Sequence, residues 1–391
     1  MTPGLVSVII PTKDRPNYLC EAVESVLAQT YPQIELIIVD DGSENEGAET
    51  KKALSPYLCT PHVTYVYHEN RGIGATVNRG LALAAGEYIQ RLDDDDRLLP
   101  EKIAQSVKVF SANPSVGLVA TGYYLIDENG KRYQALKPRR CPNPARLLNM
   151  LMHCVSAQAA VMVRASVHQK VGLYHNGLSG EDYIMWLKIA REFEVATMDE
   201  PLAEYRRHPG NTTVPIHQPK LEREMMGFLV EMVKTTPLSV LIPGLESKAH
   251  GYAMRAAVFL VRDREHFRTT ELAKGALLTA LELAPKDPLL SLWKGVLAVY
   301  GDGSLQPFPW QESLPEVYQK KAAALAGFFT ERNRLLAANI HPSSPKLIDF
   351  RQRFGRFRKE LIAETFLRAL GKEGHEMEGE VTQEGGESVC A

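Results

Sequence analysis

Residues 87–96 read Glu87-Tyr88-Ile89-Gln90-Arg91-Leu92-Asp93-Asp94-Asp95-Asp96, a short segment with an apolar centre that ends in four aspartates. The segment suits a strand that runs to the surface, and Pro100 suits the start of a helix soon after it. The aspartates therefore lie in a strand-to-helix loop. Carboxylates about 4 Å apart repel one another by roughly 4 kcal/mol at a protein-like effective dielectric constant. We therefore expect positive charge beside this loop.

The alternation of side chains in an extended chain indicates what that positive charge could be. Asp93 and Asp95 would point to one side, and Asp94 and Asp96 to the other. Asp93 and Asp95 could then offer two oxygens to one hard cation, Mg²⁺ or Mn²⁺. The alternative is a solvated acidic turn that caps the next helix, an interpretation that suits one aspartate better than a run of them.

The composition limits the class of protein. The chain has 391 residues, which is room for about two or three domains. Its 45 basic and 47 acidic side chains nearly balance, which argues against a dedicated nucleic-acid binder. The cysteines are scattered without the paired spacing of a zinc or redox motif, so we expect a reducing compartment. They are Cys20, Cys59, Cys141, Cys154 and Cys390.

The apolar segments do not have the pattern of a signal peptide or a membrane span. The run 5–10 lacks a basic region ahead of it and stops at Pro11, so we interpret it as a buried first strand. The stretch 147–163 contains polar residues and is shorter than the roughly 20 residues that a spanning helix needs. We therefore expect a cytoplasmic protein, with peripheral contact at the inner membrane face as an alternative.

The first 130 residues alternate between β-branched apolar runs and helical patterns, which predicts an α/β domain with a mostly parallel sheet. Such sheets bind ligands outside the carboxyl ends of their strands. Three motifs, Pro11-Thr12, Asp40-Asp41-Gly42-Ser43 and the aspartate run, each follow a predicted strand, so they should converge at one edge. The predicted strands are 6–11, 35–39, 63–67, 87–92 and 117–125, and the predicted helices include 16–29 and 74–85.

A turn-rich linker, 209–215, separates this pattern from a helical one, which predicts a domain at 1–214, a helical domain at 215–372 and a disordered tail at 373–391. Residues 271–288 have spacings that resemble a tetratricopeptide helix, but without a clear second copy we favour helical hairpins packed in a bundle. Residues 346–372 interleave phenylalanines with arginines. We interpret this segment as a helix docked on the core, with binding to an anionic membrane surface as the alternative.

Two further motifs have a structural and a functional interpretation. Asp40-Asp41-Gly42-Ser43 is either a tight turn or a carboxylate that accepts a hydrogen bond from a polar ring N–H, such as that of uracil. Asn70-Arg71-Gly72, with Asn78 beyond it, is either a structural loop or a phosphate cradle at a helix start.

The last two motifs lie further along the chain. Glu181-Asp182 opens an amphipathic helix, either as a complement to the helix dipole or with one carboxylate as a general base. His208 follows two arginines and is either a surface histidine or a contact for a metal or a diphosphate.

Taken together and in order, these motifs resemble an inverting family 2 glycosyltransferase of the GT-A fold. The resemblance covers roughly residues 5–210 and leaves out the helical remainder. It is carried by Val6-Ser7-Val8-Ile9-Ile10-Pro11-Thr12, Glu35-Leu36-Ile37-Ile38-Val39-Asp40-Asp41-Gly42-Ser43, Asn70-Arg71-Gly72, the aspartate run, and Glu181-Asp182 with Trp186.

The resemblance implies a nucleotide-sugar donor, most often a UDP-sugar, a divalent metal, Mn²⁺ or Mg²⁺, and a direct displacement with inversion. It implies Asp182, or else Glu181, as the catalytic base and Asp95, Asp93 and His208 at the metal. The residues that it implies at the donor are Pro11, Thr12, Asp40, Asp41, Asn70, Gly72, Asn78, Asp93 and Asp94, with Asp41 at the base of the nucleotide.

The chain departs from the family pattern at Thr76-Val77-Asn78, where many relatives carry an Ala-Arg-Asn type of sequence. Arg71 or Arg79 is then the alternative contact for the diphosphate. The acceptor would be a glycan, a lipid-linked molecule or a protein, and the helical domain could form a homo-oligomer.

Other functions stay open at this stage. A nucleotidyltransferase should carry a glycine-rich loop after its first strand, whereas residues 11–16 lack glycine. A phosphatase with an aspartyl nucleophile should carry an Asp-x-Asp spacing at the second strand end, which is absent. A non-catalytic module that binds a nucleotide sugar, with the helical domain making protein contacts, is the remaining alternative.

Overall fold

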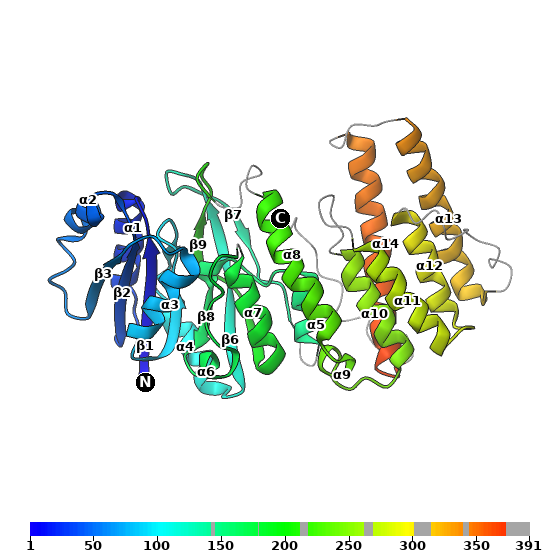
Figure 1. Cartoon of the computed structure of the whole chain (residues 1–391), viewed down its shortest axis with the longest axis horizontal. Coiled ribbons are helices and arrows are strands. Elements are labelled where there is room, and N and C mark those ends of the chain that lie inside the picture. Colours follow the sequence, from blue (N-terminus) through cyan, green and yellow to red (C-terminus); the bar gives the residue numbers. More distant parts are fainter. Residues whose placement is uncertain are drawn as a thin grey trace. The chain divides into compact units, whose positions relative to one another are not determined.

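A computed structural model describes residues 1–141, 145–178, 180–211, 218–261, 269–300, 314–338 and 344–372. It divides into two compact units, Met1–Phe228 and a second that begins at Leu229. Figure 1 shows a sheet flanked by helices in the first unit and helices in the second. The predicted boundary at residue 214 and the predicted tail, 373–391, lie outside the described residues.

The sheet of the first unit has the strand order β3-β2-β1-β4-β8-β6-β9-β5, with β7 paired to β6. Its strands are β1 (Thr2–Thr12), β2 (Ile34–Asp41), β3 (Val63–His68), β4 (Gly86–Arg91), β5 (Arg97–Leu98), β6 (Val116–Ile126), β7 (Arg132–Leu136), β8 (Val161–Arg164) and β9 (Glu194–Arg206). The helices around it are α1 (Pro16–Leu27), α2 (Glu44–Leu54), α3 (Ile73–Leu83), α4 (Lys102–Ala112), α5 (Arg146–Met152), α6 (Val167–Val171) and α7 (Glu181–Glu192), with a 3₁₀ turn, η1 (Gln158–Ala160).

The half of the sheet from β3 to β4 is parallel, and β6 and β9 also run parallel to each other. The α/β fold and the predicted strands are therefore confirmed. β8 joins the two halves by antiparallel pairing with both β4 and β6. We did not predict β8 or β9, because β8 is a short part of a longer apolar stretch and β9 mixes charged residues with Pro201.

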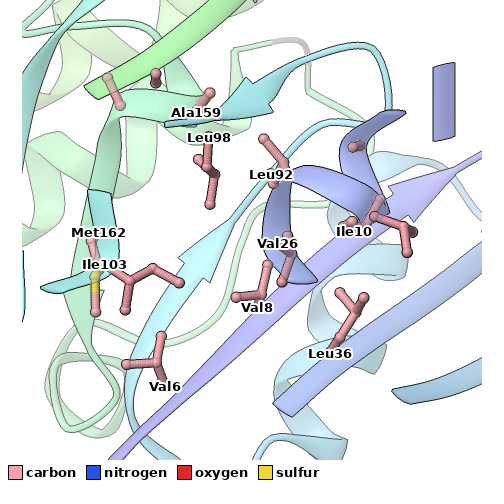
Figure 2. Close-up of a cluster of buried hydrophobic side chains, with 14 of the residues drawn as sticks. Val6, Val8, Ile10, Val26, Leu36, Leu92, Leu98, Ile103, Ala159 and Met162 are labelled. Carbon is pink, nitrogen blue, oxygen red and sulfur yellow. The ribbon is translucent and has the colours of Figure 1, made fainter. Parts of the chain in front are cut away.

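The alternation of β1 places its side chains on two faces of the sheet. Val6, Val8 and Ile10 point into one buried cluster with Val26 of α1 and Leu36 of β2 (Figure 2). Residues of the sheet's second half, such as Met162 of β8, join the same cluster. The core under α1 and α4 is therefore continuous across the parallel and the antiparallel parts.

Ile9 points to the opposite face of β1, where it contacts α3. A Cβ added at Gly80 would lie 2.4 Å from Ile9 Cγ2. The absence of a side chain at Gly80 therefore lets α3 approach the sheet closely, and α3 is the helix that follows the Asn70-Arg71-Gly72 loop.

The second unit is built from helices, and α8 spans the boundary between the units. Phe328 of α13 contacts Phe350 and Phe354, which are buried on α14. Phe350 and Phe354 thus pack inside this unit, as expected for a helix docked on the core. No described helix is both long enough and apolar enough to cross a membrane. The helices are α8 (Gln218–Thr235), α9 (Leu238–Leu241), α10 (Lys248–Val261), α11 (Thr270–Leu283), α12 (Pro288–Tyr300), α13 (Glu316–Ala337) and α14 (Pro345–Ala369).

We predict that Gly80→Ala destabilises the first unit by about 1–3 kcal/mol, because Ile9 must leave its packed position. The matched control is Gly227→Ala on α8, where an added Cβ meets nothing within 4 Å and alanine favours the helix. Urea-unfolding midpoints followed by circular dichroism measure both effects. An unchanged midpoint for Gly80→Ala would contradict the close packing of α3 on β1.

Candidate functional site

The carboxyl ends of β1, β2 and β4 lie side by side, and two of the predicted motifs meet there directly. Thr12 pairs in register with Asp40 across β1 and β2. The Thr12 hydroxyl donates to Asp94 Oδ2 at 2.7 Å, and both side chains are buried. The structure therefore brings the Pro11-Thr12 motif and the aspartate run to one sheet edge.

Asp40 is fully buried, and the chain itself occupies both of its carboxylate oxygens. Oδ1 accepts from the Ser43 backbone N–H at 2.8 Å, and Oδ2 accepts from the Tyr65 hydroxyl at 2.8 Å. Burial raises the pKa of Tyr65, which also donates to this carboxylate. Asp40 thus anchors the turn at the end of β2, which is the structural interpretation of this motif.

Asp41 holds the Asn70-Arg71-Gly72 loop against the end of β2. Its Oδ1 accepts from the Arg71 N–H at 2.8 Å, and its Oδ2 accepts from the Gly72 N–H at 3.1 Å. A Cβ at Gly42 would lie 2.6 Å from the Asn70 backbone nitrogen, so this contact requires glycine. The two amides that could cradle a phosphate are therefore engaged by Asp41, while the Asn70 side chain is exposed.

Asn78 ties α3 to the segment that precedes the Glu181-Asp182 motif. Its amide nitrogen donates to the Tyr174 carbonyl at 2.9 Å, and its Oδ1 accepts from the Tyr174 N–H at 2.9 Å. Arg71 and Arg79, the alternative diphosphate contacts, are both exposed. The Asn78 side chain therefore holds the Tyr174 backbone against α3.

Asp94 and Asp95, the two central aspartates of the run, share one arginine. Asp94 accepts from Arg15 Nη1 at 3.2 Å, and the same nitrogen donates to Asp95 Oδ2 at 3.0 Å. Burial, followed by the charge of Asp95, raises the pKa of Asp94 to about 7. Arg15 directly precedes α1, so its bonds to Asp94 and Asp95 fix the aspartate loop to the start of that helix.

Asp96 has a structural role. It is fully buried and accepts from the Arg206 backbone N–H at 2.9 Å, while Arg206 Nε donates to the Asp95 carbonyl at 2.7 Å. Burial raises the pKa of Asp96 well above its usual range. Arg206 is itself fully buried and bonds Glu21 Oε2 at 2.6 Å, so β9 and α1 hold the loop from behind.

Asp95 and His208, both predicted to lie at the metal, face each other. Asp95 Oδ2 lies 2.9 Å from His208 Nε2 and accepts from Asn211 Nδ2 at 3.3 Å. The Gly210 N–H donates to His208 Nδ1 at 3.1 Å, so the neutral ring carries its proton on Nε2. Metal binding at Nε2 would require the other tautomer and a turn of the Gly210 amide.

The described residues contain no group of three or more His, Cys, Asp and Glu side chains placed to hold a metal ion. Asp93, which we expected near the metal, bonds Arg91 Nε at 2.9 Å. A carboxylate and an imidazole nevertheless fit Mg²⁺ or Mn²⁺ when substrate phosphates supply further oxygens. The donor set therefore fits a metal that is completed by a diphosphate.

One arginine, Arg91, links the Glu181-Asp182 motif to the aspartate run. Glu181 Oε1 accepts from Arg91 Nη1 at 2.8 Å, and both side chains are buried. Asp182 is partly exposed, and its Oδ1 accepts from the Tyr183 backbone N–H at 2.6 Å. Burial, followed by the charge of Glu181, raises the pKa of Asp182 to about 7.

We did not predict Arg15 or Arg91 as site residues. The signal for Arg91 was available, because an arginine two positions before an acidic run on a buried strand requires carboxylate partners. One of those partners, Glu181, is 90 positions away, and only the fold brings it near. Arg15 follows the first strand in a segment whose conformation the sequence does not reveal.

Comparison with known proteins assigns the family. A model of glycosyl transferase family 2 matches residues 7–170. An uncharacterized glycosyltransferase of Rickettsia prowazekii (strain Madrid E) is 31% identical over 267 residues, which are 66% of this chain and 80% of that protein. This chain belongs to glycosyl transferase family 2. A longer relative from Rickettsia conorii (strain ATCC VR-613 / Malish 7) is 30% identical over 277 residues, 69% of this chain and 44% of that relative.

A solved structure shares the fold of this family 2 glycosyltransferase. The S. aureus TarS fragment 1-349, crystallised in complex with UDP-GlcNAc, superposes with a TM-score of 0.52 at 15% identity. The match covers 94% of this chain and 92% of the TarS chain. The fold is therefore of the GT-A type, as the sequence predicted.

We predict that Asp182→Asn makes the protein more stable at pH 8, by about 1–3 kcal/mol. The native pKa of Asp182 lies above its unfolded value, so the native state binds the proton more tightly between about pH 4 and 7. Wild-type stability therefore falls as pH rises through this window, whereas the neutral amide has no such loss. Urea unfolding at pH 4 and pH 8 measures the difference, and an equal effect at both pH values would contradict it.

Proposed function

We propose that this family 2 glycosyltransferase is a metal-dependent, inverting enzyme that moves a sugar from a UDP-sugar to an acceptor hydroxyl in glycan or polysaccharide synthesis. The observation that carries the proposal is the pairing of two acidic motifs through Arg91. Arg91 bonds Asp93 of the aspartate run and Glu181 of the second motif. Asp182, which follows Glu181, is half-buried. The aspartate run would then bind the leaving diphosphate, and Asp182 would face the acceptor hydroxyl.

The donor would lie across the ends of β1, β2 and β4. The TarS structure that shares this fold was solved with UDP-GlcNAc, which supports a UDP-sugar as the donor. Thr12 and Asp41 line the edge where the nucleotide would bind, although Asp41 also holds the Asn70-Arg71-Gly72 loop. Asp93 and Asp94 would face the sugar or the ribose.

The metal would be held by Asp95 and His208, whose facing atoms are 2.9 Å apart. When bound, Mn²⁺ or Mg²⁺ would neutralise charge that develops on the departing diphosphate. Arg15 places a permanent positive charge beside Asp94 and Asp95, and its side chain is 35% exposed. The guanidinium could therefore also contact a diphosphate oxygen.

Asp182 would act as the general base. A carboxylate whose pKa lies near 7 is a stronger base than an ordinary aspartate, and about half of it is ionised at neutral pH. The acceptor oxygen would then attack the anomeric carbon from the face opposite the diphosphate, form the new glycosidic bond and release UDP. A single displacement of this kind inverts the configuration.

We expect the wild-type chain, incubated with Mn²⁺ and a panel of UDP-sugars that includes UDP-GlcNAc, to release UDP from at least one of them. Asp182→Asn should lose at least about 10²-fold in kcat while still binding UDP, because the base contributes to proton transfer only. Removal of the metal with EDTA should also stop the release. The matched control is Asp349→Asn, an exposed aspartate on α14 that pairs with Arg353.

Two outcomes would contradict this proposal. UDP binding without release from any donor, with or without candidate acceptors, would favour a binding module. Full activity in Asp182→Asn would remove Asp182 as the base.

We also expect kcat/KM to rise with pH through about 7 and then level off, because Asp182 must lose its proton before it can accept one. The pH profile of UDP release at low donor concentration measures this limb. A profile that falls with rising pH between 6 and 8 would be inconsistent with a carboxylate base whose pKa is raised.

A further inference from the structure

Arg91 is a charged residue that the proposed reaction does not use directly. It is the last residue of β4, and its side chain is only 4% exposed. Its Nε donates to Asp93 Oδ1 at 2.9 Å, and its Nη1 donates to Glu181 Oε1 at 2.8 Å. One guanidinium therefore bonds the acidic motif on the donor side and the acidic motif on the base side at the same time.

Asp182 lies next to this link in the chain. Among the described residues, the Asp182 carboxylate accepts one hydrogen bond, from the backbone N–H of Tyr183. Glu181, its neighbour in the first turn of α7, is the side chain that joins this helix end to β4. Gly180, just before the helix, has a φ of +78°, a left-handed conformation that suits glycine. Arg91 therefore links the start of α7 directly to β4.

The same arginine also faces the segment before α7. Its Cζ lies 5.8 Å from the centre of the Tyr174 ring. The Asn78 side chain of α3 forms two hydrogen bonds with the Tyr174 backbone. Arg91 is thus surrounded by groups from β4, the aspartate loop, α7 and the Tyr174 segment. A guanidinium suits such a place because it donates in several fixed directions, whereas a lysine ammonium is a single point of charge.

We propose that Arg91 is a positioning residue that holds the base helix, α7, at a fixed distance from the aspartate loop that would bind the donor. The inference rests on the proposed function and names a residue that this function alone does not assign. In-line displacement requires the base, the acceptor oxygen and the leaving group to be aligned, and a misplacement of about 1 Å can cost about 10²-fold in rate. Arg91 would set that alignment without touching the substrate.

The experiment compares Arg91→Lys, Glu181→Gln and the double variant by UDP release and by calorimetric binding of UDP with Mn²⁺. The UDP-sugar is the one that the wild-type chain consumes fastest. Each single variant should lose about 10²-fold in kcat with UDP affinity little changed, because each breaks the same link. The double variant should be no slower than the slower single variant, since both act through one interaction.

The pH profile separates positioning from proton transfer. Both single variants should keep a limb that rises with pH, because Asp182 still titrates in them. Loss of the limb in Glu181→Gln would instead identify Glu181 as the base and overturn the positioning role. Glu181→Gln keeps a hydrogen-bond acceptor at the buried site, so it serves as the second variant if Arg91→Lys does not fold.

The matched control is Arg164→Lys on β8. Arg164 also pairs with a carboxylate, Glu87, and it lies opposite Tyr88 on β4 rather than near Asp93. This variant should retain wild-type kcat. A wild-type kcat in Arg91→Lys, or an equal loss of kcat and of UDP affinity, would overturn the inference and leave the proposed function standing. Absence of turnover in the wild-type chain would overturn both.

Discussion

Four successive carboxylates repel one another, and the first unit compensates them with hydrogen-bond donors from several of its elements. Asp93 pairs with Arg91, Asp94 and Asp95 with Arg15, and Asp96 with the backbone of Arg206. These partners come from β4, from the turn before α1 and from β9. The loop after β4 is therefore the point at which distant parts of the chain are joined.

This arrangement is expensive in free energy, because buried ion pairs lose most of the hydration of both partners. Burial disfavours the ionised form of these carboxylates and raises the pKa of Asp94 and of Asp182 to about 7. Proteins commonly accept such destabilisation where a site must hold charge in a fixed geometry. The apolar cluster under α1 and α4 supplies the stability that tolerates it.

Parts of the site could be predicted because they depend on local pattern. The apolar runs before Thr12, Asp41 and Asp93 mark strands, and parallel strands place their carboxyl ends at one edge. A local pattern does not choose between the structural and the functional interpretation of a side chain. Asp40 is occupied by Ser43 and Tyr65, a fact that depends on which strand lies next to β2 and not on the turn sequence.

The sequence by itself determined the α/β class, the family and the order of the acidic motifs, since these follow from hydrophobic periodicity and from motifs whose spacing is local. Only the tertiary structure decided which carboxylates stay accessible and which become structural anchors. That choice depends on long-range partners, because Arg91 contacts Glu181, 90 positions away, and Asp95 contacts His208, 113 positions away. Electrostatic compensation acts through space, and a linear pattern cannot specify which charges will meet.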